Sequence, residues 1–397
     1  MAEQRLRIDD QDRYARLRLI SWWDQSRLAG ARVMVVGAGA LGNEVLKNLA
    51  LVGIGRVDIV DLDRVETANL SRSVLFRAGD RGRPKAEVAA AAVRALNPDV
   101  RVQAVCGNVQ TAVGLGWFRR ADVVIGCLDN REARWWVNRC CWKMARPWID
   151  GGIQELNGVV KVFTPPRGAC YECAMTENDY RLMNLRYRCP PGRVDEVAEG
   201  NVPTTPTIAA MIGGWQTQEA LKLLHGMPVG EGEALVYNGQ TNRFYRTQFQ
   251  RREDCGSHER YQPVLELATA SAGGTAHQLF AALRGRLELP AVTDAPLCLV
   301  LDRDLLVSVR CPACVWEQAV MQPMPLAAGR DGMCPGCGEP VRPQLQHRIE
   351  EGSDLADHAL VDLGVPAYDV VRVASGSHEW FVLLDADRDM VEGGDGG

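Results

Sequence analysis

Two features that would tie the chain to a membrane are missing from the sequence. No stretch of about eighteen consecutive apolar residues, the length that spans a bilayer as a helix, occurs among the 397 residues. Residues 1–20 are charged throughout and contain no apolar centre of the kind found in signal peptides. We therefore expect a cytoplasmic protein without a membrane partner.

An excess of charge of one sign is also missing, and lysine is scarce. The formal net charge is −5, with 24% charged and 46% apolar residues. This balance is typical of a globular protein of two or three domains, and it gives no electrostatic reason to expect nucleic acid as a partner. Only five of the 45 basic residues are lysines. We attribute this to gene composition rather than to selection against modification of the chain's own lysines.

The first 260 residues alternate between strand and helix patterns. Apolar runs followed by helical periodicity predict an α/β fold built on a doubly wound, Rossmann-like sheet. Residues 1–30 are expected to be an amphipathic helical segment, with Trp22 and Trp23 docked on the body. The expected strands are 32–36, 57–60, 101–105 and 122–126, and the expected helices are about 40–52, 84–96 and 131–144.

The composition changes near Tyr261. We expect residues 1–260 to form the first domain and residues 261–388 a C-terminal α+β domain that contains a zinc ribbon. Short strands are expected around Cys298 and Ser308. Residues 389–397 form an acidic, glycine-rich end that is expected to be disordered.

The stretch GAGALG contains Gly37, Gly39 and Gly42, and it joins a predicted strand to a predicted helix. Glycines at these positions permit a tight turn and let backbone N–H groups approach a phosphate at the helix N-terminus. Nicotinamide, flavin and ATP enzymes all use this arrangement. On this motif alone, an NAD-dependent oxidoreductase is the default expectation.

The stretch DLDRVETANLSRS, residues 61–73, contains more polar groups than hydride transfer requires. Asp61 ends the second strand, where a carboxylate accepts hydrogen bonds from ribose hydroxyls. Asp63, Asn69 and Arg72 come next, and Lys85 begins the next helix. Cations beside the phosphate turn are useful when a triphosphate binds and pyrophosphate must leave. The sequence therefore favours ATP over NAD.

A further polar group comes after the strand predicted at 122–126. Asp129 and Asn130 stand at its carboxyl end, where ligands of open α/β sheets collect. Asp129 is placed to hold Mg²⁺ against phosphates. The alternative is an N-cap for the helix that begins at Arg131.

Together these motifs resemble the ThiF/MoeB/HesA-type ubiquitin-activating superfamily, whose members use ATP to adenylate the C-terminal glycine of ubiquitin-like proteins. The resemblance covers roughly residues 10–260. Ser73 stands where the family often has glutamine, and we expect no effect on the chemistry. The matching stretches are RYARL, GAGALG, DLDRVETANLSRS, GRPKAE, CLDNREAR, CYEC and VPTTPTIAAMIGGWQTQEALKLL.

The resemblance implies a role for each matching residue. Asp61 would hold the ribose, Asp129 would serve Mg²⁺ and catalysis, and Arg16 would reach the ATP of a partner subunit. A homodimer with two composite sites is implied by the role of Arg16. The residues expected to contact the phosphates are Asn69, Arg72 and Lys85.

Disulfide-rich proteins are typically small and secreted, whereas the 13 cysteines here belong to a large chain with no signal-peptide pattern. Several of them fall in metal-ligand spacing instead. Cys170 and Cys173, with the distant Cys255 and His258, predict a structural Zn²⁺ site of mixed thiolate and imidazole ligands. The family usually has two cysteines in the second pair, so His258 is a substitution. A second set has the spacing of a zinc ribbon and predicts another Zn²⁺ site, formed by Cys311, Cys314, Cys334 and Cys337.

Cys189 lies in a loop between arginines at 186, 188 and 193, which would lower its pKa and activate the thiol. In the family, a cysteine of this region often takes the activated carrier as a thioester. The alternative is an incidental loop thiol. Five other cysteines are expected in the core: Cys106, Cys127, Cys140, Cys141 and Cys298.

The sequence therefore predicts an activating enzyme that adenylates a ubiquitin-like protein. The next steps would be transfer to Cys189 and delivery to a conjugating enzyme docked on residues 261–388. The nearest alternative is a sulfur-carrier adenylyltransferase that forms no thioester. Modification of a peptide or small molecule, an NAD-dependent oxidoreductase and a non-enzymatic zinc adaptor are further alternatives.

Overall fold

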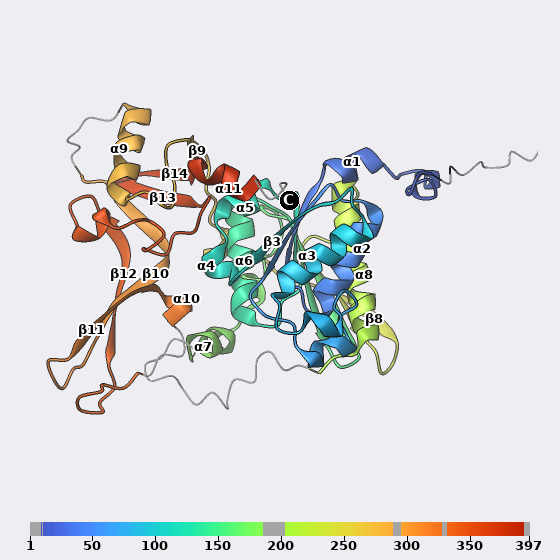
Figure 1. The fold of residues 1–397 in the computed structure, drawn as a ribbon, viewed down its shortest axis with the longest axis horizontal. Helices are drawn as coiled ribbons and strands as arrows, with labels where there is room; N and C mark the ends of the chain where they lie inside the picture. The colour runs from blue at the N-terminus through green and yellow to red at the C-terminus, as the bar shows by residue number, and fades with distance from the viewer. Residues whose placement is uncertain (1–8, 10, 186–202, 289–294, 328–331, 393–397) are drawn as a thin grey trace, which may run out of the picture.

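The computed structural model describes residues 9, 11–185, 203–288, 295–327 and 332–392. Two sheets organise these residues, and Figure 1 shows them as neighbouring parts of the molecule. The strands β1–β8 fall within residues 32–248, and β9–β14 fall within residues 264–384. The expected domain boundary at residue 260 lies in the connection between the two sheets.

The first sheet has eight strands in the order β3-β2-β1-β4-β5-β6-β7-β8. Neighbouring strands are parallel from β3 to β5 and antiparallel from β5 to β8. The chain order reverses between β1 and β4, which creates the switch point where open α/β sheets bind ligands. The strands are β1 (Arg32–Val36), β2 (Arg56–Asp61), β3 (Arg101–Cys106), β4 (Val123–Gly126), β5 (Trp148–Gln154), β6 (Asn157–Phe163), β7 (Glu233–Asn238) and β8 (Arg243–Gln248).

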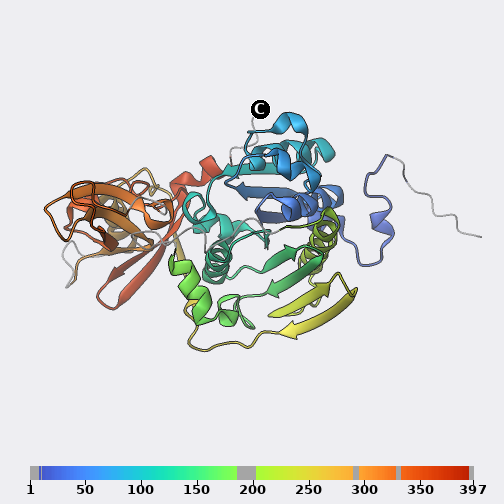
Figure 2. The same cartoon turned by 90° about the horizontal axis from the view of Figure 1, so that it is seen from below.

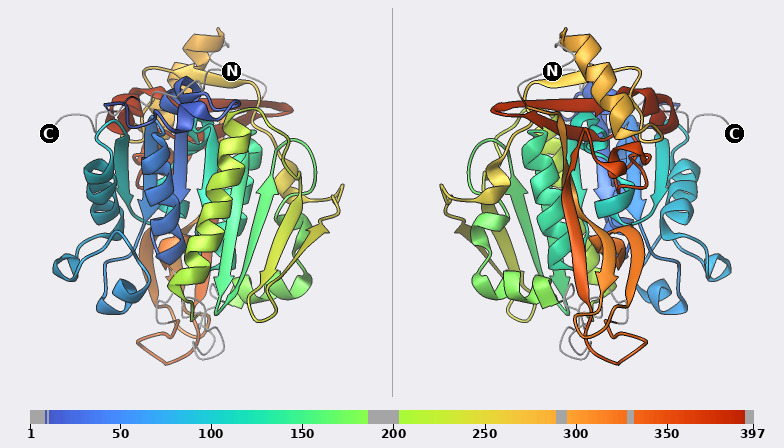
Figure 3. Two further views of the ribbon diagram at one scale, coloured as in Figure 1. Left: turned by 90° about the vertical axis from the view of Figure 1, so that its right-hand side faces the viewer. Right: turned by 90° about the vertical axis from the view of Figure 1, so that its left-hand side faces the viewer.

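Helices cover both faces of this sheet, as a doubly wound fold requires (Figure 3). One core joins α2, α3 and α8 to the sheet, and another joins α4, α5 and α6 to its opposite face. Within the described ranges, no helix combines the length and apolarity needed to cross a bilayer. The helices are α1 (Gln25–Gly30), α2 (Ala40–Val52), α3 (Lys85–Leu96), α4 (Val109–Ala112), α5 (Leu115–Arg120), α6 (Arg131–Lys143), α7 (Glu177–Leu185) and α8 (Pro206–Leu224).

The second sheet runs in the order β11-β10-β13-β14-β9, with β12 also paired to β10. It lies beside the face that carries α4, α5 and α6 (Figures 1 and 2). The two strands expected near Cys298 and Ser308 are one strand, β10. The elements are β9 (Val264–Leu267), α9 (Ala276–Leu287), β10 (Cys298–Arg310), β11 (Glu317–Pro323), α10 (Met324–Ala327), β12 (Arg342–Glu350), β13 (Val370–Ser375), β14 (His378–Leu384) and α11 (Arg388–Glu392).

The two domains share a core. Apolar side chains of α4, α5 and α6 pack with Tyr261, Tyr368, Val370 and Leu383 of the second part of the chain. The Tyr261 ring stacks on Phe381 with centroids 4.2 Å apart. The C-terminal domain is therefore fixed to the first domain by buried apolar surface.

Among the described residues, the helical segment expected over residues 1–30 is confirmed only in part. The described part contains only a short 3₁₀ turn, Leu17–Leu19, and α1. The expected docking of the two tryptophans is confirmed, because both rings contact His225 at the end of α8. Asp24 is the N-cap of α1 and accepts hydrogen bonds from two backbone N–H groups, so the helix begins only at Gln25.

The expected disorder of residues 389–397 is wrong for residues 389–392, which belong to α11. Val391 is only 2% exposed, and its carbonyl oxygen accepts hydrogen bonds from Arg56 and Arg120 at 3.2 and 3.3 Å. Cations at the C-terminal end of a helix are favourable partners for its carbonyl groups. Residues 393–397 lie outside the described part.

Candidate nucleotide site and zinc centres

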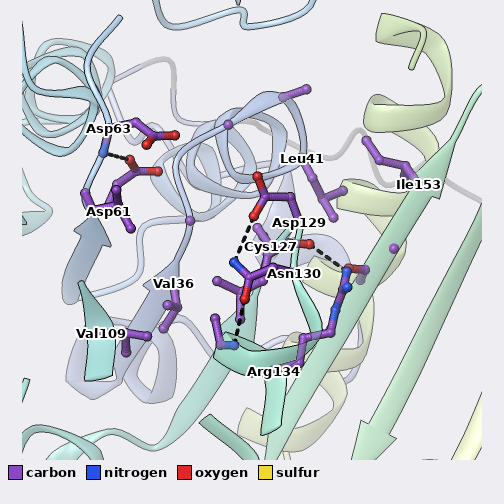
Figure 4. Close-up of a pocket in the computed structure, with 18 of the residues that line it drawn as sticks. Val36, Leu41, Asp61, Asp63, Val109, Cys127, Asp129, Asn130, Arg134 and Ile153 are labelled. Atoms are coloured by element: carbon purple, nitrogen blue, oxygen red, sulfur yellow. Dashed lines mark hydrogen bonds between the residues drawn. The ribbon is translucent and has the colours of Figure 1, made fainter. Parts of the chain in front are cut away.

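A cavity of about 1030 Å³ lies at the carboxyl ends of the parallel strands, beside the switch point between β1 and β4 (Figure 4). Figure 4 shows Asp61 and Asp63 on one side, across from Asp129, Asn130 and Arg134. All but one of the residues predicted to bind ATP line this cavity: Gly37, Gly39, Asp61, Asp63, Asn69, Arg72, Lys85, Asp129 and Asn130.

The remaining residue, Gly42, lies in the first turn of α2 and has a packing role. A Cβ at Gly42 would lie 2.0 Å from the carbonyl oxygen of Gly37. Gly37 itself has φ +98°, and its Cβ would lie 2.3 Å from the carbonyl oxygen of Cys127. A Cβ at Gly39 would meet nothing within 4 Å, and Gly39 lines the cavity, so there is space for a phosphate close to its backbone.

Asp61 is fixed at the end of β2 by backbone groups. Its Oδ2 accepts the N–H of Ala38 at 2.6 Å, and its Oδ1 accepts the N–H of Asp63 at 2.8 Å. Burial raises the pKa of Asp61, and the two amide hydrogen bonds act in the opposite direction. Each carboxylate oxygen can accept a further hydrogen bond, so both remain available to a ligand.

Lys85 and Asp63 form an ion pair at 2.8 Å on the cavity wall. The lysine side chain is 11% exposed, whereas the aspartate side chain is 51% exposed. The backbone N–H of Lys85 also donates to the Asp63 carbonyl at 2.9 Å. Lys85 is therefore held at the N-terminus of α3 and directed toward the cavity residues.

Asn69 lies in a short 3₁₀ turn, Thr67–Ser71, and Arg72 follows directly after this turn. Asn69 Oδ1 accepts the N–H of Glu66 at 2.9 Å. Arg72 donates one hydrogen bond to the Ala68 carbonyl at 3.1 Å. The local turn orders both side chains before any ligand binds.

The N-cap of α6 is Asn130, whose side chain accepts the N–H of Ala133 at 2.8 Å. The alternative that Asp129 caps this helix is therefore wrong. Asp129 instead accepts a hydrogen bond from the Asn130 amide at 3.1 Å and borders the cavity. Its carboxylate is the type of ligand that Mg²⁺ prefers.

Sequence reasoning missed a buried charge cluster at the cavity floor. Asp150, on β5, is fully buried between Arg134 and Lys161, each 2.9 Å away. Burial alone would raise the pKa of Asp150, but the two cations outweigh this effect and hold its pKa below its usual value. The signal in the sequence was an aspartate that directly follows the apolar residues Trp148 and Ile149.

Besides Gly42, one predicted residue that the structure describes does not line this cavity. Arg16 is exposed in the N-terminal segment and does not line it. Cys189 lies outside the described residues. The cavity does contain Cys127, which we expected in the core, but burial raises the pKa of this thiol well above its ordinary value. Cys106 is exposed rather than buried, and Cys140, Cys141 and Cys298 are buried as expected.

Both predicted zinc-ligand sets come together in space, and the ligand atoms within each set lie within 4.8 Å of one another. In the first set, the Cys170 and Cys255 sulfurs are 3.5 Å apart, and Cys173 Sγ is 3.3 Å from His258 Nε2. The His258 ring stacks on Trp142, which fixes its orientation. Three thiolates and one imidazole suit tetrahedral Zn²⁺.

The second set joins the ends of β10 and β12. Cys311 Sγ lies 3.5 Å from Cys337 Sγ, and Cys314 Sγ lies 3.6 Å from Cys334 Sγ. Backbone N–H groups of residues 313 and 336 donate to the sulfurs of Cys311 and Cys334, as in a knuckle turn. Four thiolates in this arrangement fit a structural Zn²⁺.

Comparison with known proteins identifies relatives of the first domain. The sulfur carrier protein adenylyltransferase of Thermus thermophilus is 37% identical over 238 residues, covering 58% of this chain and 83% of that protein. The SAMP-activating enzyme E1 of Haloferax volcanii is 36% identical over 236 residues, which cover 58% of this chain and 81% of that protein.

The crystal structure of E. coli MccB with ATP has a TM-score of 0.52 at 22% identity, over 65% of this chain and 77% of that one, and shows the shared fold. The model of the ThiF family matches residues 11–257, and this match ends before β9. More than half of the chain is matched, and the chain therefore belongs to the ThiF family.

Proposed function

We propose that the chain adenylates the C-terminal glycine of a ubiquitin-like protein with ATP. The observation that carries this proposal is the convergence of Arg72, Lys85 and Asp129 on one cavity beside the glycine turn. This combination fits a triphosphate whose α-phosphate is attacked. The relatives named for sulfur-carrier adenylation and for E1 activation support the same reaction class.

In this reaction, a carboxylate oxygen of the carrier attacks the α-phosphorus. The bond from this phosphorus to the bridging oxygen of the β-phosphate breaks, and pyrophosphate leaves with the bonding electrons. Asp61 would accept hydrogen bonds from the ribose, and Gly39 would let backbone N–H groups approach a phosphate. Arg72 and Lys85 would stabilise the negative charge that develops on the phosphates. No proton transfer is required, so positioning supplies most of the catalysis.

Asp129 is the residue that fits Mg²⁺, because its carboxylate borders the cavity and is free of the helix cap. A bound Mg²⁺ would neutralise phosphate charge. The zinc sites are structural in this proposal, since all four ligands of each come from the protein and no position is left open.

We further propose that Cys189 takes the carrier from the adenylate as a thioester and that residues 261–388 dock a conjugating enzyme. The thiol would lose its proton to solvent, and its sulfur would bond to the carrier's terminal carbonyl carbon. The bond from that carbon to the phosphate oxygen would break, and AMP would leave. Arg16 would complete the site of a partner subunit in a homodimer, which is compatible with its exposed position away from its own cavity. Activation for sulfur transfer, without a thioester, is the second candidate and is supported by the T. thermophilus relative.

One experiment separates the two candidates. The purified protein is mixed with Mg·ATP and ubiquitin-like proteins that end in glycine, and intact masses are measured without reductant. A thiol-sensitive adduct that Cys189→Ala abolishes supports activation through a thioester. A carrier that gains only the mass of AMP supports sulfur-carrier activation. Binding of NADH without binding of ATP would overturn the adenylation proposal as a whole.

A further inference from the structure

One wall of the cavity is held from behind by the C-terminal domain. This wall is the segment 107–110, which comes directly after β3 and begins α4. Arg303, on β10, donates a hydrogen bond from Nε to the carbonyl oxygen of Gln110. A residue of the C-terminal domain thus fixes the backbone of a residue that lines the nucleotide cavity.

A second contact holds the same segment a few residues later. Asp369 Oδ1 accepts the N–H of Leu115 at 2.6 Å, and the Tyr368 carbonyl accepts the N–H of Gly116 at 3.0 Å. A Cβ at Gly116 would lie 2.3 Å from that carbonyl oxygen, so the approach requires glycine. The C-terminal domain therefore contacts residues 110–116 at both ends.

Arg303 also connects the two contacts. Its Nη1 lies 3.4 Å from Asp369 Oδ2, and its guanidinium carbon lies 4.4 Å from the centre of the Trp136 ring on α6. Both charged side chains are 4% exposed. A guanidinium held by a carboxylate, a carbonyl and a ring has little freedom to move, so it defines the position of the Gln110 backbone.

The held segment presents polar side chains to the cavity. Gln110 donates from Nε2 to Glu132 Oε1 at 2.9 Å, and both side chains line the cavity. Pro325, from α10 of the C-terminal domain, lines it as well. A shift of the Gln110 backbone would move this pair and change the shape of the nucleotide site.

We propose that Arg303 is a positioning residue for nucleotide binding, through which the C-terminal domain sets the affinity of the cavity for ATP. The inference rests on the proposed function, because it takes the ligand to be ATP. It also gives the C-terminal domain a role in the adenylation site itself.

The test measures binding of a non-hydrolysable ATP analogue to the full, zinc-loaded chain by calorimetry, without a carrier. For Arg303→Met we expect roughly tenfold weaker binding, the size of effect found when a coupling contact is removed. Arg372→Met is the matched control. Arg372 also joins the two parts of the chain, by an ion pair of 2.9 Å to Glu259, but it does not line or contact the cavity segment. This control should bind the analogue as the wild type does.

Thermal melting and zinc content show whether each variant is folded. If Arg303→Met does not fold, Arg303→Lys decides by the same criterion, since it keeps the charge beside Asp369 but loses the planar fork. Unchanged affinity in a folded Arg303 variant would overturn the inference. An equal loss in Arg372→Met would also overturn it, because the effect would then come from general loosening of the domains. A wild-type chain that binds no ATP would instead overturn the proposed function.

Discussion

Lys85 and Asp63 are ion-paired on the wall of the cavity, with the cation buried and the carboxylate half exposed. A phosphate entering the cavity and Asp63 therefore compete for the same ammonium group. The backbone N–H of Lys85 also donates to the carbonyl of the same aspartate at 2.9 Å, so the two residues are joined through backbone and side chain. A triphosphate, which carries more negative charge than one carboxylate, would be the stronger partner for Lys85 in the proposed reaction.

The first prediction concerns this lysine. Lys85→Met should lower the rate of carrier-dependent exchange of pyrophosphate into ATP by about 100-fold, because it removes a charge that we propose stabilises the leaving group. Lys47→Met is the matched control, since Lys47 pairs with Glu44 on α2 and does not line the cavity. Equal activity of the two variants would show that Lys85 has no part in the reaction.

The second prediction concerns the buried carboxylate of Asp150. Its pKa is lower in the folded protein than in the unfolded chain, so its ionised form stabilises the fold above about pH 4 and this contribution disappears as pH falls through the folded pKa. Asp150→Asn leaves Arg134 and Lys161 without their carboxylate and should lower the free energy of unfolding by about 3–5 kcal/mol at pH 7.

Urea unfolding at several pH values tests this prediction. The difference between wild type and Asp150→Asn should shrink as the pH is lowered below about 4, because the wild type then loses the same charge. Asp304→Asn, at an exposed position of β10, should show little difference at any pH. A difference between wild type and Asp150→Asn that stays constant with pH would contradict the assignment of the charge cluster.

The third prediction is that each chain binds two zinc ions. Cys170→Ser and Cys311→Ser should each reduce the zinc content from two ions per chain to one, since the two cysteines belong to separate ligand sets. Elemental mass spectrometry measures this content. Cys298→Ser provides the control, because Cys298 is buried but belongs to neither set. Loss of both ions in either ligand variant would mean that the sites are not independent.

The fourth prediction tests the docking of α11. Val391→Asp places a charge in the shared core and should lower the free energy of unfolding by about 2–4 kcal/mol. Met390→Asp changes the neighbouring side chain, which is 72% exposed, and should have almost no effect. The two variants differ only in the face of α11 that is altered, so similar melting temperatures would show that α11 does not dock in solution.

The sequence was sufficient for the elements that depend on local patterns. The strands β1–β4 and the helices α2, α3 and α6 could be predicted from apolar periodicity and from the glycine turn, both of which act over a few residues. The two zinc-ligand sets were also predictable, because cysteine spacing restricts the possible partners. The residues that line the cavity could also be expected to lie together, because they follow strands whose carboxyl ends meet at one edge of the sheet.

The features that could not be predicted depend on contacts between distant segments. Arg56 and Arg120 order α11, but nothing near Val391 in the sequence indicates such partners. The hydrogen bond from Arg303 to Gln110 likewise joins residues 193 positions apart. Asp150 escaped notice because its partners Arg134 and Lys161 come from a helix and from the neighbouring strand.

The core that Tyr368, Val370 and Leu383 share with α4, α5 and α6 has a consequence for cooperativity. Neither part of the chain can unfold without exposing apolar surface of the other, so heat should melt both in a single calorimetric transition. A fragment ending at residue 260 would present that surface to water and would aggregate. The ThiF family match therefore ends within a shared core, and we expect the family domain of this chain to depend on the C-terminal part for its folding.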